Sequence, residues 1–151
     1  MRNSEVRRCG GFRFLEHMSD VYFEATGNSI EEVFEWAAKA MFETMTDTSK
    51  VKPLKEVIIE DEGIDLMNAL YRWLEDLLIE YSANNMVFSK FKVEYVRQIS
   101  NDRVVFKGRA WGEEFNPEIH EPRVEVKAVT YSLMEIGKKN NCWYARVVLD
   151  I

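Results

Sequence analysis

The sequence has little histidine, cysteine, proline or glycine: among its 151 residues these number two, two, three and seven. With two histidines, a zinc hydrolase would need unusual ligands. The glycines are scattered and form no phosphate-binding loop, and the chain has neither a Gly-x-Ser-x-Gly elbow nor a His-Glu-x-x-His helix. No spacing marks a serine or a cysteine as an activated nucleophile. We therefore expect that the protein is not an enzyme in its own right.

The two cysteines, Cys9 and Cys142, stand far apart, which excludes a zinc knuckle and a disulfide framework. The first six residues lack the apolar core of a signal peptide. No apolar run approaches the roughly 20 residues that a membrane-spanning helix needs. We expect a soluble, cytoplasmic protein with no membrane contact and with reduced thiols.

The net charge is −6 and the pI is near 5.1, which argues against self-sufficient binding of nucleic acid. Basic residues nevertheless gather between residues 90 and 109, against only Glu94 and Asp102. The basic residues there are Lys90, Lys92, Arg97, Arg103, Lys107 and Arg109. A solvated strand face explains most such runs. Direct RNA binding through this segment remains an alternative.

Periodicity predicts a helix from residue 30 to about 45, started by Ser29 and Glu32 in a capping box. Its outer face, with Glu31, Glu35 and Lys39 four residues apart, is typical of a solvated surface. A second helix is predicted from Asp65, its N-cap, to about residues 82–85, where asparagine readily takes the left-handed conformation that closes a helix. The predicted strands are 11–15, 20–25, 56–60, 91–96, 104–111, 124–134 and the run from Cys142.

Each of the two helices has one apolar stripe to bury. We therefore predict one domain over residues 1–151 with an α+β fold. It would have two layers, with two amphipathic helices packed on one face of a largely antiparallel sheet.

Asp20 and Asp150 are the candidate metal ligands. Asp150 is followed by Ile151, where the printed sequence stops, so the main-chain carboxylate of Ile151 is a third donor. If the last strand lies beside the strand of Asp20, these three groups converge, and such oxygen-rich sets hold hard cations such as calcium. His17 lies three residues before Asp20, and it either takes part in this site or pins the turn.

Two further acidic segments, 60–65 and 113–121, compete for metal, but neither fits a calcium loop. The first is more simply a helix start and the second a solvated loop, in which His120 is free to meet a partner. Lys127 stands among apolar residues, and on periodicity alone it is an outward-facing residue of a strand.

Five segments together resemble the archease family, the small proteins that assist tRNA processing, from about Gly11 to Ile151. The segments are 14–20, 37–47, 115–120, 126–131 and 145–151. The chain departs from the family pattern at Met18 and Ser19, where Thr-Ala is usual, and at Ser132, where histidine is frequent.

The resemblance implies a two-layer fold of helices on a sheet and a divalent metal site, with Ca²⁺ at Asp20, Asp150 and the Ile151 carboxylate. It implies as partner a GTP-dependent tRNA-splicing RNA ligase, which joins a 3′-phosphate or cyclic phosphate to a 5′-hydroxyl. The protein would promote guanylylation and multiple turnover of that ligase.

Lys127 matches a lysine linked to that role, and we assign Lys127, His17 and His120 to the contact with the partner. The alternative is a chaperone or specificity factor for a tRNA cytosine methyltransferase, with weak or indirect contact to tRNA.

Overall fold

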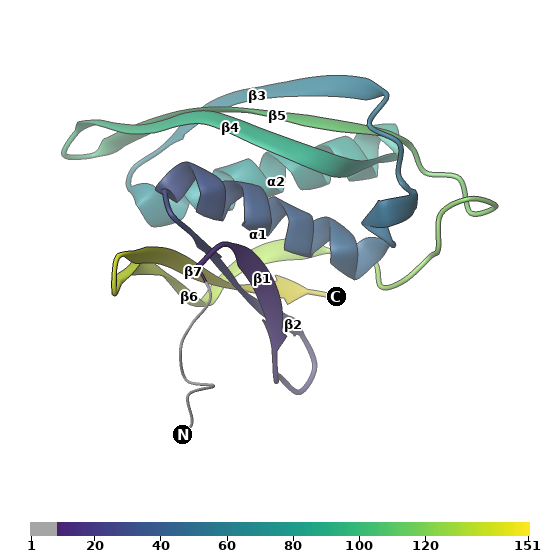
Figure 1. Cartoon of the computed structure of the whole chain (residues 1–151), viewed down its shortest axis with the longest axis horizontal. Helices are drawn as coiled ribbons and strands as arrows, with labels where there is room; N and C mark the ends of the chain where they lie inside the picture. The colour runs from purple at the N-terminus through teal and green to yellow at the C-terminus, as the bar shows by residue number, and fades with distance from the viewer. Residues whose placement is uncertain (1–8) are drawn as a thin grey trace.

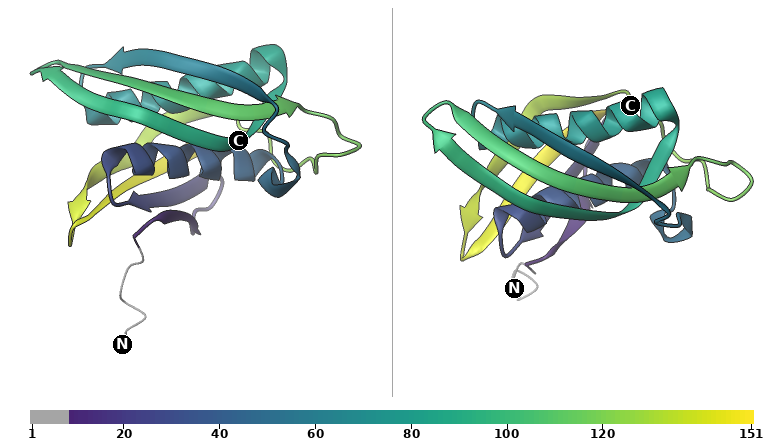
Figure 2. Two further views of the ribbon diagram at one scale, coloured as in Figure 1. Left: turned by 45° about the horizontal axis from the view of Figure 1, so that its top comes forward. Right: turned by 90° about the horizontal axis from the view of Figure 1, so that it is seen from above.

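The computed structural model describes residues 9–151 and places two helices between two antiparallel sheets (Figures 1 and 2). In chain order the elements are β1 (Gly11–Leu15), β2 (Val21–Gly27), α1 (Ile30–Met45), the 3₁₀ turn η2 (Thr48–Lys50), β3 (Lys55–Gly63), α2 (Leu66–Asn84), β4 (Met86–Ser100), β5 (Arg103–Glu114), β6 (Ala128–Lys139) and β7 (Cys142–Asp150). The prediction that no signal peptide begins the chain falls on residues that the structure does not describe. No helix within residues 9–151 has the length and apolar character to cross a membrane.

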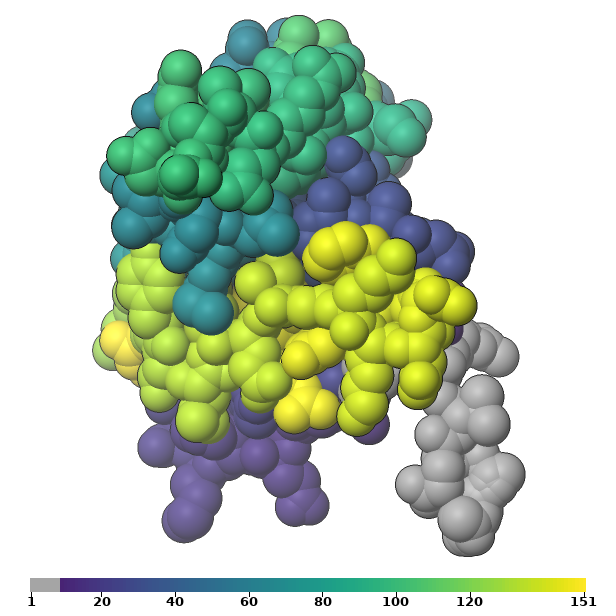
Figure 3. All heavy atoms as spheres, turned by 90° about the vertical axis from the view of Figure 1, so that its left-hand side faces the viewer, coloured from purple at the N-terminus to yellow at the C-terminus, as the bar shows by residue number. Residues whose placement is uncertain are grey.

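One sheet has the strand order β1-β2-β7-β6 and the other the order β3-β5-β4. The first combines strands from both ends of the described chain, whereas the second is built from its middle. Figure 3 views the end of the molecule where the β4–β5 and β6–β7 turns lie, one above the other, with the helical layer between them.

Both helices begin where a side chain satisfies a free backbone N–H group, and both end where a backbone N–H closes the last turn. The Ser29 hydroxyl accepts a hydrogen bond from the Glu32 N–H at 3.1 Å, and the Glu32 carboxylate accepts one from the Asn28 N–H at 2.8 Å. At α2, Asp65 accepts from the Asn68 N–H at 2.7 Å, and Asn85 closes the helix in the left-handed conformation at φ 57°. These predicted helix boundaries are confirmed.

The core fills the space between each helix and the two sheets. Trp73 of α2 is fully buried, and its indole N–H donates a hydrogen bond to the Phe34 carbonyl of α1 at 2.9 Å. Its ring lies against Gly108 of β5, where an added Cβ would come within 2.6 Å of the ring. Gly108 is therefore required for this close approach of α2 to the sheet.

The α+β class and the antiparallel pairing are confirmed, but the structure has two sheets rather than one. A stripe pattern shows that a helix buries a face, and it does not show that the helix has a second sheet behind it. The strand predicted at 124–134 begins only at Ala128, because the Arg123 and Val124 N–H groups donate hydrogen bonds to the Met45 and Thr44 carbonyls at the end of α1, at 3.1 and 3.2 Å, rather than to a strand.

The prediction that Glu31, Glu35 and Lys39 form a solvated face of α1 is also wrong. Glu31 and Glu35 accept hydrogen bonds from the backbone N–H groups of Val96 and Val93, at 3.1 and 2.8 Å. The Lys39 ammonium donates to the Ser89 carbonyl at 2.7 Å. The three side chains therefore bind β4, an edge strand whose pairing with β5 is interrupted at three places. Charged side chains four residues apart occur both on a solvated helix face and on a helix face that binds a strand, so the spacing alone cannot distinguish the two.

The expectation of reduced thiols is overturned by a disulfide between Cys9 and Cys142, whose Cα atoms are 5.7 Å apart. The two cysteines are 133 residues apart in sequence, and a separation of that size carries no signal of proximity. The bond ties the segment before β1 to the first residue of β7.

Candidate metal and partner-binding edge

Three strand ends meet at one edge of the β1-β2-β7-β6 sheet. Val21 is paired with Leu149, so Asp20 stands one position beyond this pair, opposite Asp150. Asp150 is paired in turn with Ala128, and the Lys127 N–H donates a hydrogen bond to the Asp150 carbonyl at 2.7 Å. The start of β2, the end of β7 and the approach to β6 are therefore neighbours, and we call this place the carboxylate edge.

His17 and Asp20 lie within the turn between β1 and β2. The Nδ1 of His17 is 3.9 Å from an Asp20 carboxylate oxygen, and the imidazole ring meets the Tyr22 ring edge-on at 5.7 Å between centroids. A distance of 3.9 Å is too long for a hydrogen bond, so the pair interacts electrostatically only when His17 is protonated. About a third of each of these two side chains is exposed.

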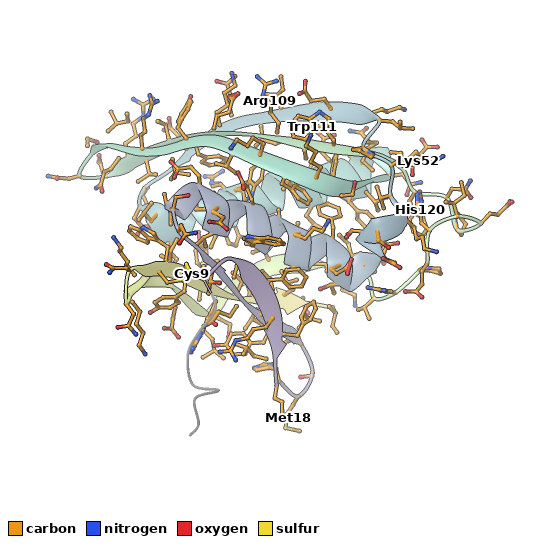
Figure 4. The ribbon with its side chains drawn as sticks, in the orientation of Figure 1. Cys9, Met18, Lys52, Arg109, Trp111 and His120 are labelled. Carbon is orange, nitrogen blue, oxygen red and sulfur yellow. A yellow bond between two sulfur atoms is a disulfide. The ribbon has the colours of Figure 1, made fainter. Side chains whose placement is uncertain are left out.

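A cavity of about 290 Å³ opens beside Asp20. Its lining comes from the β1–β2 hairpin and the last turn of α1, and Glu43 adds a second carboxylate there. Sequence reasoning did not single out Glu43, although it lies within one of the segments that resemble the archease family. Met18, at the tip of the same hairpin, is fully exposed (Figure 4).

Lys127 is exposed between two buried valines, Val126 and Val129. Lys127 borders a second cavity, of about 400 Å³, between the C-terminal half of α2 and residues 125–129. The backbone of Lys127 thus contacts Asp150, while the residue also lines a groove beside α2. Sequence periodicity predicts Lys127 only as an outward-facing strand residue, because periodicity does not show that Asp150 is its neighbour on the adjacent strand.

The ligand atoms available at the carboxylate edge are of the type that binds a hard cation. Asp20, Asp150 and the Ile151 carboxylate offer only oxygen atoms, which calcium and magnesium prefer. Within residues 9–151 no group of three or more His, Cys, Asp or Glu side chains is close enough to hold a metal. A cation there would therefore be coordinated by two side chains and a main-chain carboxylate, and several water molecules would complete its coordination shell. Calcium and magnesium both accept water as a ligand.

His120 lies elsewhere, in the loop after β5, and is 1% exposed (Figure 4). Its Nδ1 accepts a hydrogen bond from the Asn116 N–H at 2.9 Å, so Nε2 carries the proton and donates to Glu113 at 2.8 Å. Hydrogen bonding from the Lys52 backbone, and secondarily from His120, lowers the pKa of Glu113. Both ring nitrogens are used within the chain, so His120 holds this loop, and a partner would reach the ring only if the loop opened.

The family model described as the archease protein family matches residues 12–151. An archease of Sulfolobus acidocaldarius is 48% identical over 140 residues, which cover 93% of this chain and 98% of that one. An archease of Aeropyrum pernix is 43% identical over 144 residues, covering 95% of this chain and 99% of its own.

Two solved structures resemble the fold. The solution structure of protein 1598 of Methanobacterium thermoautotrophicum is 45% identical, with a TM-score of 0.81, and covers 93% of this chain and 99% of its own. The crystal structure of an archease from Thermotoga maritima, described as a possible chaperone, is 20% identical, with a TM-score of 0.54. It covers 91% of this chain and 94% of that one, and at this identity it supports the fold alone.

Proposed function

The chain belongs to the archease family, and on this premise we propose that it is an accessory protein for an RNA-processing enzyme. The partner we propose is a GTP-dependent RNA ligase that joins a 3′-phosphate to a 5′-hydroxyl. The protein would promote guanylylation of this ligase and sustain its multiple turnover. Membership of the family supports the choice of partner, and the position of Asp20, Asp150 and Lys127 at one end of a sheet supports this surface as the one that would meet it.

One observation supports this proposal above the others: Asp20, Asp150 and Lys127 come from three separate segments to one sheet edge. Two aspartates and a lysine are thus brought to neighbouring backbone positions where the side chains of Lys127 and Asp150 are exposed. They suit contact with phosphates and a divalent cation, which are the ligands of a nucleotidyl-transfer site.

In this proposal Asp20, Asp150 and the Ile151 carboxylate would hold a divalent ion, with Ca²⁺ the expected one. A bound ion would supply positive charge that offsets the charge of a phosphate. Lys127 would bind a phosphate or a ligase carboxylate as a compact positive charge. The hydrogen bond between the Lys127 backbone and Asp150 fixes the position of the lysine relative to the carboxylates.

The proposal is tested by a multiple-turnover ligation assay and a guanylylation assay with the cognate ligase. Wild type should stimulate both, and Asp20→Asn and Asp150→Asn should each lose the stimulation. Asp102→Asn, in the turn between β4 and β5, is the matched control and should behave as wild type. A folded wild-type protein that gives no stimulation would refute the ligase role.

A second candidate is a chaperone of a tRNA cytosine methyltransferase. The β1–β2 hairpin favours it, because Met18 is 100% exposed and Phe14 is 51% exposed. Large apolar side chains that are exposed on a hairpin are suited to bind a partner protein. Met18→Ser would then reduce protection of the methyltransferase from aggregation while leaving ligase stimulation unchanged.

A further inference from the structure

The outer face of the β3-β5-β4 sheet carries a row of basic and aromatic side chains. Along β5, Val104, Phe106 and Ala110 are buried against the helices, so the alternate residues point outward. The outward residues of β5 are Val105, Lys107, Arg109 and Trp111. Figure 4 shows Arg109 and Trp111 on the side of the sheet away from the helices.

The register continues this row onto β4. Lys90 is paired with Trp111, Lys92 with Arg109 and Tyr95 with Lys107. Side chains of paired residues share one face of a sheet. We call the set Lys90, Lys92, Tyr95, Arg97 and Trp111 the β4–β5 face.

Two cations of this face lie over aromatic rings. The Lys90 ammonium is 4.8 Å from the centroid of the Trp111 ring, and the Arg97 guanidinium carbon is 4.4 Å from that of Tyr95. One face of each ring is thus covered by a positively charged side chain of the same sheet.

The cationic side chains of this face that form no ion pair within residues 9–151 lie on β4. Arg109 is paired with Glu94 and Glu56, at 3.0 and 3.2 Å, and Lys107 is 3.5 Å from Glu94. Lys90, Lys92 and Arg97 have no carboxylate within ion-pair distance among residues 9–151. The outward residues of β3 include Glu56, Glu60 and Glu62, of which Glu62 is ion-paired with Arg103 at 3.0 Å and Glu56 with Arg109, so among the described residues the far side of this sheet carries no row of free cations.

We infer that the β4–β5 face binds single-stranded nucleic acid along β4. Bases would stack on Trp111 and Tyr95, and phosphates would bind Lys90, Lys92 and Arg97. On binding, a base takes the ring face and the displaced cation moves to a phosphate. The carboxylates on β3 make that side of the sheet less favourable for phosphates than β4.

An acidic protein is the competing ligand for a basic face. It would use the cations but not the ring faces, because a carboxylate gains nothing from the electron-rich face of an aromatic ring. Half-buried rings with cations stacked on them offer both a surface for bases and a contact for phosphates, so nucleic acid is the better match. This binding needs no ligase and stands apart from the function proposed above.

The test is fluorescence anisotropy of labelled 12-nucleotide single-stranded RNA and DNA with the protein alone, over a range of salt concentrations. Wild type should bind at low salt. The double variant Lys92→Gln/Arg97→Gln should bind at least about tenfold more weakly, and its salt slope should fall by about 1.4, for two lost phosphate contacts. Trp111→Leu should weaken binding about tenfold without changing the slope.

Lys138→Gln is the matched control, because Lys138 lies over Trp143 at 5.6 Å on the other sheet. This variant should bind as wild type does. Equal affinity for RNA and DNA would indicate recognition by stacking and phosphate contact, and tighter binding of RNA would add the 2′-hydroxyl.

Three results would overturn the inference. The first is no binding at low salt by a protein with unchanged circular dichroism. The second is equal weakening by Lys138→Gln, which would show general charge attraction. The third is unchanged nucleic-acid binding in the Lys92/Arg97 variant together with lost ligase stimulation, which would make the face a protein-docking surface.

Discussion

The carboxylate of Glu35 on α1 accepts a hydrogen bond from the backbone N–H of Val93 on β4, at 2.8 Å. The bond closes a place where the pairing of β4 with β5 shifts register. Burial raises the pKa of Glu35, and the hydrogen bond from Val93 opposes that rise only in part. An edge strand is therefore completed by a helix side chain instead of by a neighbouring strand.

Glu35→Ala should lower the free energy of unfolding by about 1–3 kcal/mol, because the Val93 N–H loses its partner. Glu35→Gln keeps an acceptor oxygen without the charge that burial disfavours, and it should be nearly neutral. Urea unfolding of both variants at neutral pH measures the difference. Equal loss in the two variants would mean that the charge, not the hydrogen bond, holds the strand.

Reduction of the Cys9–Cys142 bond should destabilise the protein by about 4–5 kcal/mol in the chain-entropy account, because the bond closes a long loop. Thermal unfolding with and without reductant measures the effect. The double variant Cys9→Ser/Cys142→Ser should melt at the temperature of the reduced wild type and ignore the reductant. Two free thiols in the native, unreduced protein would contradict the bond.

Burial and the neighbouring Asp61 raise the pKa of Asp76 from 3.8 to about 7. The folded state then holds a proton that the unfolded state releases near pH 4. Stability contributed by this group is present below pH 4 and is lost as the pH rises toward about 7.

Asp76→Asn should therefore raise the urea midpoint at pH 8 more than at pH 5. Asp102→Asn, at an exposed turn, should shift neither midpoint. If Asp76→Asn were equally stabilising at both pH values, titration of Asp76 would not explain its effect.

Lys127→Ala should lower ligase stimulation about tenfold, as expected for one lost contact to a charged group. The hydrogen bond to Asp150 uses the Lys127 backbone and survives the substitution, so circular dichroism and the melting temperature should not change. Lys139→Ala, near the far end of β6, is the control. A fall in melting temperature with Lys127→Ala would make the lysine structural.

A glycine added after Ile151 would move the terminal carboxylate away from Asp150. We expect Ca²⁺ binding, measured by titration calorimetry, to weaken on the order of tenfold or more, because one charged ligand leaves the set. Ile151→Val keeps the carboxylate in place and should bind as wild type does. Unchanged affinity of the extended protein would remove Ile151 from the ligand set.

Local features of the fold could be predicted, and long-range ones could not. The caps at Ser29, Asp65 and Asn85 depend on residues within four positions, and all three are present. The second sheet and the Cys9–Cys142 bond depend on which distant segments meet, and no short pattern encodes that. At the site, Asp20 and Asp150 were singled out on the condition that their strands lie side by side, and β2 and β7 do pair. Metal binding there stays a prediction.

The strand order β1-β2-β7-β6 has a consequence for how the protein is made. Glu24 on β2 and Arg146 on β7 are neighbours in the sheet yet 122 residues apart in sequence. During translation β2 therefore emerges with its inner edge open and waits for β7, whereas β3, β4 and β5 follow one another closely and can assemble first. An open edge invites pairing with other chains, so the nascent protein is exposed to aggregation until the last strand leaves the ribosome.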